Sequence, residues 1–564
     1  MKPVISIGTQ DFEFFRKNHY FYIDKTGFIK DWWENGDMVT LITRPRRFGK
    51  TLNMSMVEQF FSNQYEGRGD LFEGLAIWEE EACREIQGSF PVLALSFAAV
   101  KEQDYQKARR KICQLITNLY MKHRFLIEGF LKDKDRDFFE SVCVDMDDNA
   151  ATLALYQLAD YLSRYYGKKV IILLDEYDTP LQEAYVNGYW GELTAFIRGL
   201  FNATFKTNPY LERGLLTGIT RVSKESIFSD LNNLEVVTTT SEKYAAAFGF
   251  TEEEVVSALE EFDIPDELER VRYWYDGFRF GSRRGIYNPW SITKYLDSGK
   301  LGTYWANTSS NSLVGKLIRE GSPDIKIAVE DLLEGRQIVT ALDEEIVFDQ
   351  LDDNEAAIWS LLLASGYLKV DDISNEEEEG DALYHLSLTN LEVKKVFRKM
   401  IQAWFKKGAT RYNDFIKALL AGDVDYMNQY MNQVALQTFS FFDTGKRTSE
   451  QSEPERFYHG FVLGLIVDLA DQYRITSNRE SGLGRYDVVM EPLEKGLRAI
   501  VIEFKVLNPR REKDLQETVQ NALGQIKDMG YDAELVARGV PGDRICHYGF
   551  GFEGKTVLIG GENG

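Results

Sequence analysis

The sequence predicts a multidomain α/β protein: a parallel β-sheet covered by helices, a helical or winged-helix-like connector, and a smaller C-terminal α/β domain. In the first half, short apolar runs alternate with long polar stretches of helical spacing, which is typical of a parallel sheet covered by helices. The last part has a compact helix, strand, strand, helix, strand order. Because 564 residues exceed what one hydrophobic core normally serves, we expect domains at 1–287, 288–445 and 446–564.

The first domain begins with a strand expected at 37–43, which runs directly into a turn rich in Arg, Gly and Lys. Residues 52–61 follow with the apolar spacing of a helix. Further apolar runs predict strands at 92–97, 170–175 and 211–217. A strand, loop and helix in this order is the context that a phosphate-binding loop requires.

The connector is expected to be mainly helical, with helices at 358–368 and 391–405. The acidic run at 376–379 reads as a solvated loop tip, and the polar stretch at 444–455 reads as a linker. In the last domain we expect a helix at 455–464, strands beginning at 484 and 499, a helix around 521–526 and a final strand at 555–559.

Composition limits the possible partners. The formal net charge of -23 argues against a broad basic surface, so any DNA or RNA groove must be local or supplied by a partner. No run of about 18 apolar residues and no basic-then-apolar N-terminus is visible, so we expect no membrane span and a cytoplasmic location. Four scattered cysteines lack the paired spacing of zinc sites, and we expect buried, reduced thiols.

The loop from Arg44 to Thr51 carries the second half of a phosphate-binding motif in Gly49, Lys50 and Thr51. In such loops backbone N–H groups surround the phosphates, Lys reaches the terminal phosphates, and Ser or Thr holds Mg²⁺. Arg44 stands where the usual motif has its first Gly, and Arg46 and Arg47 would add positive charge beside the phosphates. With Phe48, these residues predict an ATP and Mg²⁺ site.

The strand at 170–175 ends in two carboxylates, Asp175 and Glu176, as a Walker B strand does. Asp175 would hold Mg²⁺ through water, and Glu176 would polarise the attacking water. A third strand leads to Thr220 and Arg221, a phosphate sensor and an arginine finger in one reading and polar capping residues in the other.

The C-terminal domain has the carboxylates and the lysine of a metal-dependent nuclease. Glu503 and Lys505 are two apart on one strand, so their side chains share a face, and Asp487 lies in the preceding strand, expected at 484–490. A charged pair on an otherwise apolar strand requires an explanation, which a metal and a catalytic lysine supply. The alternative is an exposed ladder on an edge strand.

Residues on the flanking helices extend this candidate metal site. Glu455 is a further candidate metal ligand, and His459 lies one turn later, although it reads as readily as an ordinary helix histidine. Gln525 on the following helix is expected to point toward the site.

Five segments together resemble the AAA-ATPase-like proteins of Bacteroidetes and Firmicutes that carry a C-terminal PD-(D/E)xK nuclease domain. They lie at 22–26, 44–51, 174–180, 274–279 and 287–290, and the resemblance covers nearly the whole chain. It implies an ATP-binding fold in which Arg at the first glycine position is usual. Residues 22–26 would contact adenine or ribose or cap a helix, and residues 274–279 would serve packing or binding; both readings of each stay open.

The leading functional hypothesis is a Mg²⁺-dependent ATPase whose nucleotide state controls a metal-dependent nuclease acting on DNA or RNA. The alternative is a regulatory or scaffold switch whose nuclease fold binds nucleic acid or protein without cutting. An arginine finger from a neighbouring subunit would require a homo-oligomer, whereas Arg221 acting within its own chain would not. Carbohydrate binding or transport has only the 13% aromatic content in its favour.

Overall fold

The structure is a computed structural model that describes residues 2–221, 227–228, 231–305, 314–315, 317–318, 323–342, 355–375, 382–406, 412–438, 462, 466, 469, 472–481, 484–494, 497–554 and 556–563. Contacts divide the chain into two compact units. One comprises Met1–Leu313 with Gln337–Lys394, and the other comprises Val314–Arg336 with Lys395–Gly564. The three-domain division expected from the sequence stays a prediction.

The first unit contains a five-stranded parallel sheet in the order β2-β3-β4-β1-β5. Its strands are β1 (Val39–Thr43), β2 (Val92–Ser96), β3 (Val170–Asp175), β4 (Leu211–Gly218) and β5 (Leu234–Val237). Every residue of β1 and β3 is buried, as a sheet covered on both faces requires. The predicted parallel sheet is confirmed, and β5 is a strand that the sequence analysis did not identify.

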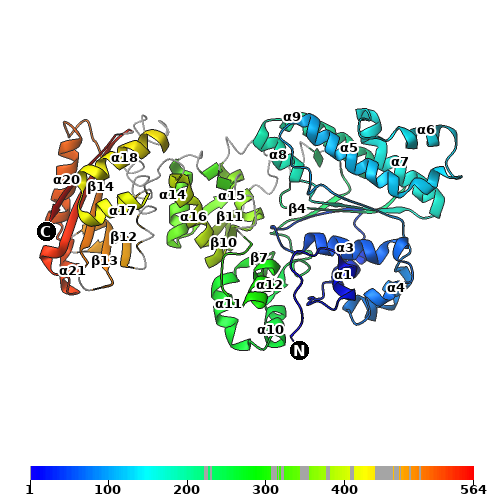
Figure 1. Cartoon of the computed structure of the whole chain (residues 1–564), viewed down its shortest axis with the longest axis horizontal. Helices are drawn as coiled ribbons and strands as arrows, with labels where there is room; N and C mark the ends of the chain where they lie inside the picture. The colour runs from blue at the N-terminus through cyan, green and yellow to red at the C-terminus, as the bar shows by residue number, and fades with distance from the viewer. Residues whose placement is uncertain are drawn as a thin grey trace. The chain divides into compact units, whose positions relative to one another are not determined.

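Helices cover both faces of this sheet (Figure 1). One face carries α1 (Phe12–Lys17), α2 (Gly27–Asn35), α3 (Lys50–Phe61) and α4 (Glu81–Ile86), whose apolar side chains pack on the strands. The other carries α5 (Tyr105–Lys122), α6 (Asp133–Ser141), α7 (Asp148–Tyr166), α8 (Thr179–Asn187) and α9 (Trp190–Phe205). Local signals set their ends: Asp104 and Asp147 cap α5 and α7, and left-handed glycines at 167 and 188 end α7 and α8.

A small subdomain follows the sheet in the same unit. It comprises β6 (Phe250–Thr251), α10 (Glu252–Glu261), α11 (Leu268–Tyr275), β7 (Phe278–Phe280), β8 (Arg283–Tyr287) and α12 (Pro289–Ser298), with strand order β6-β8-β7. Thr251 and Glu254 form a capping box at the start of α10, and Asn288 caps α12.

The region predicted as a helical or winged-helix-like connector contains a three-stranded antiparallel sheet, β10-β11-β9, whose strands the sequence analysis did not identify. The elements are α14 (Pro323–Glu334), β9 (Ile338–Ala341), α15 (Glu355–Ala364), β10 (Leu368–Asn375), β11 (Ala382–Leu388) and α16 (Leu391–Lys406). The helix expected at 358–368 ends at Ala364, because Gly366 turns the chain with φ of 84° and β10 begins at Leu368. The acidic run at 376–379 and the linker at 444–455 lie outside the described residues.

Residues 389–392, at the start of α16, contact residues of the first unit. Gly277, with φ of 138°, lies so close to this segment that a Cβ would be 1.8 Å from the Thr389 carbonyl oxygen. The buried carboxylate of Glu392 accepts hydrogen bonds from Ser291 Oγ (2.8 Å) and from the Trp305 amide (2.8 Å). These contacts place residues 389–392 in the packing of the first unit.

The second unit contains a five-stranded mixed sheet in the order β12-β13-β14-β15-β16, with β14 and β15 parallel. Its elements are α17 (Tyr412–Ala421), α18 (Val424–Thr438), β12 (Tyr473–Ser481), β13 (Gly484–Pro492), β14 (Ala499–Val506), α20 (Leu515–Asp528), α21 (Asp532–Ala537), β15 (Ile545–Glu553) and β16 (Thr556–Asn563). The sequence analysis missed β12 and β15.

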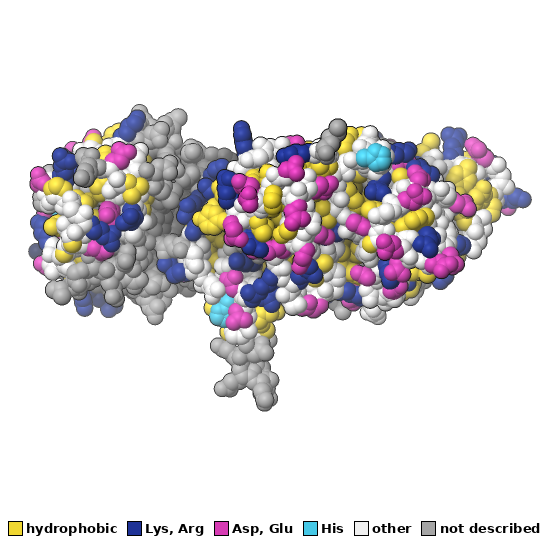
Figure 2. Space-filling view, turned by 90° about the horizontal axis from the view of Figure 1, so that it is seen from below, with side chains coloured by type: hydrophobic (Ala, Val, Ile, Leu, Met, Phe, Trp, Pro, Cys, Tyr) yellow, Lys and Arg dark blue, Asp and Glu magenta, His cyan; other side chains and the backbone are white. Residues whose placement is uncertain are grey.

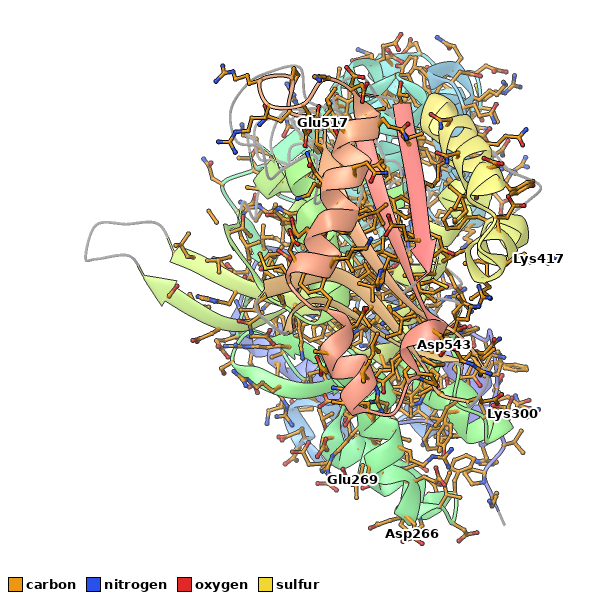
Figure 3. The ribbon with its side chains drawn as sticks, turned by 90° about the vertical axis from the view of Figure 1, so that its left-hand side faces the viewer. Asp266, Glu269, Lys300, Lys417, Glu517 and Asp543 are labelled. Atoms are coloured by element: carbon orange, nitrogen blue, oxygen red, sulfur yellow. The ribbon has the colours of Figure 1, made fainter. Side chains whose placement is uncertain are left out.

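Helices also cover both faces of this mixed sheet. One face packs against α17 and α18, and the other packs against α20 and α21. Figure 3 shows α20, with Glu517 in its first turn, lying along the strands. The α/β fold predicted for the C-terminal domain is confirmed.

Candidate functional site: a phosphate-binding loop and a carboxylate–lysine cluster

The loop between β1 and α3 has the geometry of a phosphate-binding turn. Gly49 has φ of 80° and is the N-cap of α3, so the helix begins at Lys50, immediately after the loop. Lys50 is buried, and its Nζ donates to the carbonyl oxygens of Arg44 and Pro45, both at 2.8 Å. Burial lowers the pKa of Lys50 to about 8, although the nearby charges of Glu176 and Asp175 oppose that shift.

Arg44, at the position of the usual first glycine, belongs to the protein core. Its side chain is 0% exposed, and its Nη1 donates to the carbonyl oxygens of Thr43 (2.9 Å) and Thr238 (2.6 Å). The guanidinium carbon lies 4.4 Å from the centre of the Phe280 ring. Arg44 therefore ties the start of the loop to the segment after β5 and to β7.

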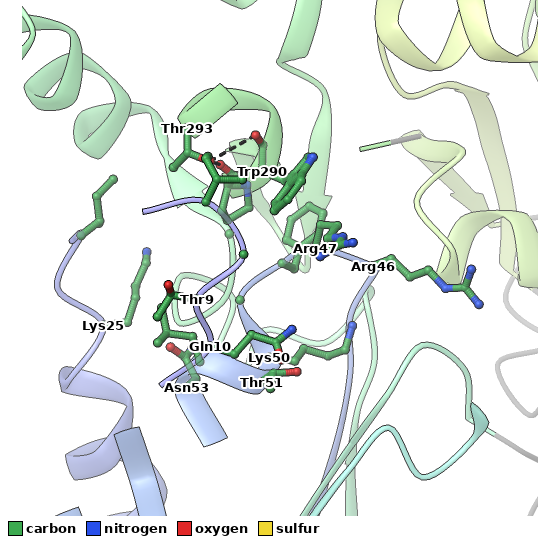
Figure 4. Close-up of a pocket in the computed structure, with 18 of the residues that line it drawn as sticks. Thr9, Gln10, Lys25, Arg46, Arg47, Lys50, Thr51, Asn53, Trp290 and Thr293 are labelled. Carbon is green, nitrogen blue, oxygen red and sulfur yellow. Dashed lines mark hydrogen bonds between the residues drawn. The ribbon is translucent and has the colours of Figure 1, made fainter. Parts of the chain in front are cut away.

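A pocket of about 500 Å³ lies over this loop (Figure 4). The predicted residues that line it are Arg46, Arg47, Phe48, Gly49, Lys50, Thr51 and Glu176. Asp175 stands directly behind Thr51, since Thr51 Oγ1 donates to Asp175 Oδ2 at 2.7 Å. The structure thus brings together the predicted loop and the predicted carboxylates at the carboxyl end of the parallel strands.

The two carboxylates of β3 have different surroundings. Asp175 is buried and also accepts a hydrogen bond from Thr217 Oγ1; burial raises its pKa, and the hydrogen bonds from Thr217 and Thr51 oppose that rise. Glu176 has a left-handed backbone with φ of 51° and lines the pocket, where its Oε2 accepts a hydrogen bond from Thr179 Oγ1 at 3.1 Å. A hydroxyl beside a carboxylate is a set of hard oxygen donors that fits Mg²⁺.

Thr220 and Arg221, which follow β4, are not among the residues that line the pocket. Thr220 is buried, its hydroxyl donates to Asp178 Oδ2 at 2.9 Å, and it is Ile219 that lines the pocket. Arg221 follows as a half-buried residue. The sensor and finger roles of these two residues stay predictions.

Several residues in the pocket or next to it were missed because only tertiary contacts reveal them. Asn288 Nδ2 donates to the Arg46 carbonyl oxygen at 3.1 Å, and the Arg47 guanidinium carbon lies 4.3 Å from the centre of the Trp290 ring. Figure 4 shows Arg47 and Trp290 next to each other, with Thr9 and Gln10 of the N-terminal segment also at the pocket. The segment 287–290 was singled out in the sequence, but nothing in its local pattern indicates contact with the loop.

The two segments without a derived role contact the pocket and the loop, and both readings of each stay predictions. Asp24 Oδ1 accepts from the amide and the hydroxyl of Thr26, which precedes α2, while Tyr22 and Lys25 line the pocket. Lys25 Nζ is held by Glu254 at 2.7 Å. In the segment 274–279, Phe278 packs edge-on against Phe48, with ring centres 4.8 Å apart.

The C-terminal carboxylates and lysine meet on one face of the mixed sheet. β14 is the middle strand and Glu503 is 2% exposed, so the alternative of an exposed edge ladder is wrong. Asp487 Oδ2 accepts a hydrogen bond from the Phe504 amide at 2.8 Å. Asp487 is the residue before Val488, which pairs with Ile502 between β13 and β14.

Gln525 on α20 joins Glu503 to Lys505. Its Oε1 accepts from Lys505 Nζ at 2.6 Å, and its Nε2 donates to Glu503 Oε1 and to the Tyr531 hydroxyl (3.2 Å). Burial raises the pKa of Tyr531, and the charges of Glu503 and Asp487 add to this rise. The expectation that Gln525 points toward the site is confirmed.

Metal binding at this second cluster rests on few described donors. Among the described residues no group of three or more His, Cys, Asp or Glu side chains is placed to hold a metal ion. Glu455 and His459 lie outside the described residues. Asp487 and Glu503 supply the carboxylate oxygens that Mg²⁺ prefers, so the donor chemistry of this pair fits that ion.

The described surface agrees with the net charge. On the face drawn in Figure 2, Lys and Arg side chains are interspersed with Asp and Glu, without a broad basic area among the coloured residues. Within the described ranges no helix combines the length and apolarity needed to cross a membrane. All four cysteines are free; Cys83, Cys113 and Cys546 are buried as expected, whereas Cys143 is exposed, so that expectation was wrong for Cys143.

Comparisons with known proteins give a domain family for each of these regions. Residues 6–228 match the family described as Predicted AAA-ATPase, and residues 453–562 match the PD-(D/E)XK nuclease superfamily. An uncharacterized protein in the vnfD 5' region of Azotobacter chroococcum mcd 1 is 26% identical over 560 residues, covering 95% of this chain and 94% of that protein. The Aeropyrum pernix ORC2 protein matches at 12% identity with a TM-score of 0.25, over 67% of this chain and 92% of that one. The chain therefore combines a domain of the predicted AAA-ATPase family with a domain of the PD-(D/E)XK nuclease superfamily.

Proposed function

We propose that this protein is a Mg²⁺-dependent ATPase whose nucleotide state controls a metal-dependent nuclease acting on DNA or RNA. The observation that carries the proposal is the convergence at one pocket of Lys50, Thr51 and Glu176, with Asp175 2.7 Å behind the Thr51 hydroxyl. Lysine, hydroxyl and paired carboxylates at the carboxyl ends of parallel strands are what ATP hydrolysis requires.

In the nucleotide site, Lys50 would exchange the carbonyl oxygens of Arg44 and Pro45 for phosphate oxygens. Glu176 would orient the attacking water and accept its proton, because its carboxylate lines the pocket. Thr51 and Asp175 would hold Mg²⁺, which when bound neutralises charge on the phosphates. Arg46 and Arg47 lie at the same pocket and would add positive charge.

In the nuclease site, Asp487 and Glu503 would hold the metal, which when bound activates water and stabilises the charge on the phosphodiester. Lys505 would position the nucleophile and support the developing negative charge. Gln525 orients Lys505 through the 2.6 Å hydrogen bond, and the same amide side chain bonds Glu503. The side chain of Glu455 would complete the ligand set.

Control of one site by the other would act through the nucleotide. Arg221 would serve as the finger within its own chain, or a neighbouring subunit of a homo-oligomer would supply one. The proposed ATPase uses ATP and the proposed nuclease acts on nucleic acid. The cytoplasm supplies both, so we place the protein there.

The experiment that tests the proposal is ATP turnover and nucleic-acid cleavage by the purified chain with Mg²⁺, for wild type, Lys50→Ala and Asp487→Ala. We expect turnover to be lost only in Lys50→Ala, and cleavage to be lost in Asp487→Ala with turnover intact. Equal cleavage by wild type and Asp487→Ala would remove the nuclease half.

The scaffold alternative has one observation in its favour: the Gln525 side chain already engages both Glu503 and Lys505. Nucleotide binding without turnover or cleavage, together with a nucleotide-dependent change in oligomeric state, would support this alternative over the enzyme.

A further inference from the structure

A buried carboxylate links the end of β3 to the end of β4. Asp178 is 1% exposed, and its Oδ2 accepts the amides of Ile219 (2.9 Å) and Thr220 (3.0 Å) and the hydroxyl of Thr220 (2.9 Å). Asp178 thus holds both the amide and the hydroxyl of Thr220, the residue that leads into Arg221.

The packing around Asp178 leaves little room for the two strand ends to shift. A Cβ on Gly218 would lie 2.9 Å from Asp178 Oδ1 and 2.6 Å from the Tyr177 ring. The Tyr177 hydroxyl donates to the Thr220 carbonyl oxygen at 2.7 Å. A change in the bonding of Asp178 would therefore move the segment after β4 rather than be absorbed locally.

Gln182 connects Asp178 to the phosphate-binding loop. On α8, its Nε2 donates to Asp178 Oδ2 at 3.0 Å, and its Oε1 accepts from Arg46 Nη2 at 3.2 Å. Arg46 lines the pocket. One amide side chain thus joins a pocket arginine to the carboxylate that holds Thr220.

We propose that Gln182 and Asp178 are positioning residues that transmit phosphate binding at Arg46 to the Thr220–Arg221 segment. The inference rests on the proposed ATP site. A guanidinium pairs with a charged phosphate, often through two parallel hydrogen bonds, more strongly than it bonds to one neutral amide oxygen, so an incoming nucleotide takes Arg46 from Gln182. The released amide changes its hydrogen bond to Asp178, and the Thr220–Arg221 segment adjusts when the phosphates are in place.

Two substitutions of Gln182 separate this role from simple structural support. Gln182→Leu frees Arg46 and cuts the link to Asp178; we expect nucleotide affinity unchanged or slightly tighter and kcat lower by about tenfold. Gln182→Glu holds Arg46 in an ion pair and repels Asp178; we expect affinity weaker by about tenfold and a similar loss in kcat.

The measurements are the Kd for a fluorescent non-hydrolysable ATP analogue, the steady-state kcat, and the melting temperature without nucleotide. Arg46→Ala is combined with each Gln182 variant. In the Arg46→Ala background Gln182→Glu should no longer weaken binding, because the ion pair that retains the arginine cannot form. Asn187→Leu, an exposed amide on the same helix, is the matched control and should leave all three quantities unchanged.

The proposal is supported if Gln182→Glu binds more weakly while Gln182→Leu binds as tightly as wild type or slightly tighter, with kcat lowered in both. An unchanged kcat in Gln182→Leu, or equal weakening by Gln182→Glu with and without Arg46, overturns it while leaving the ATPase intact. Failure of the wild type to bind the analogue removes the proposed function itself, and the positioning role with it.

Discussion

Arg44→Gly restores the usual phosphate-loop glycine, and we expect it to destabilise the protein. The substitution removes charge-assisted hydrogen bonds to the Thr43 and Thr238 carbonyl oxygens and the stack on Phe280, from a side chain that is 0% exposed. Each such bond contributes about 1.5–3 kcal/mol, and removing a large core side chain costs about 2–5 kcal/mol.

Two terms adjust this sum. The cost of burying the cation offsets part of the loss, and glycine adds about 0.5–1 kcal/mol of backbone entropy. We expect a net loss of about 4 kcal/mol in the free energy of unfolding, which corresponds to roughly 5 °C in melting temperature for a unit of this size.

Arg47→Gly is the matched control in the same loop. Arg47 is exposed and has φ of 66°, so glycine relieves backbone strain while the stack on Trp290 is lost. We expect its unfolding free energy to stay within about 1 kcal/mol of wild type. Calorimetry of both variants and wild type without nucleotide is the assay; an Arg44→Gly melting temperature equal to that of wild type would refute the structural role.

Two further predictions concern the pH dependence of Lys50 and the close approach at Gly277. Because burial holds the pKa of Lys50 near 8, the free protein loses this cation as pH rises through 8; nucleotide affinity, which needs the cation, should fall about tenfold between pH 7 and pH 9. Titration calorimetry checks this, and Lys50→Arg should bind with little pH dependence since arginine stays charged. Gly277→Ala should lower the melting temperature by several degrees, because its Cβ meets the Thr389 carbonyl oxygen at 1.8 Å; Gly191→Ala, helical and with open space, should change it little, and similar losses in both would contradict the close-packing argument.

Local sequence patterns were enough to predict β1 to β4 of the parallel sheet and the residues that follow them. The run at 170–175 is a strand with those bounds, and the two halves of the phosphate site meet because the carboxyl ends of parallel strands share one edge. Lys50, Thr51 and Glu176 were therefore predictable as neighbours.

Elements whose form depends on tertiary packing were missed. β15 contains Gly549 and Gly551, which read as turn residues, yet glycine is needed there because a Cβ on Gly549 would lie 2.8 Å from the Val519 carbonyl oxygen on α20. Asn288 and Trp290 contact the phosphate-binding loop. Asn288 and its partner Arg46 are more than 240 positions apart in the sequence, and no local pattern predicts such a contact.

The division of the chain into two interleaved units has a consequence for limited proteolysis. The polypeptide passes from one unit to the other at 313–314, 336–337 and 394–395, so each unit is assembled from two separate stretches of chain. The crossing at 394–395 lies inside α16, where a folded helix resists cleavage. A protease that cuts at 313–314 or 336–337, by contrast, leaves two fragments that still share a folded unit. They should co-migrate in native buffer and separate only on denaturation, and releasing either unit whole requires cuts at all three junctions.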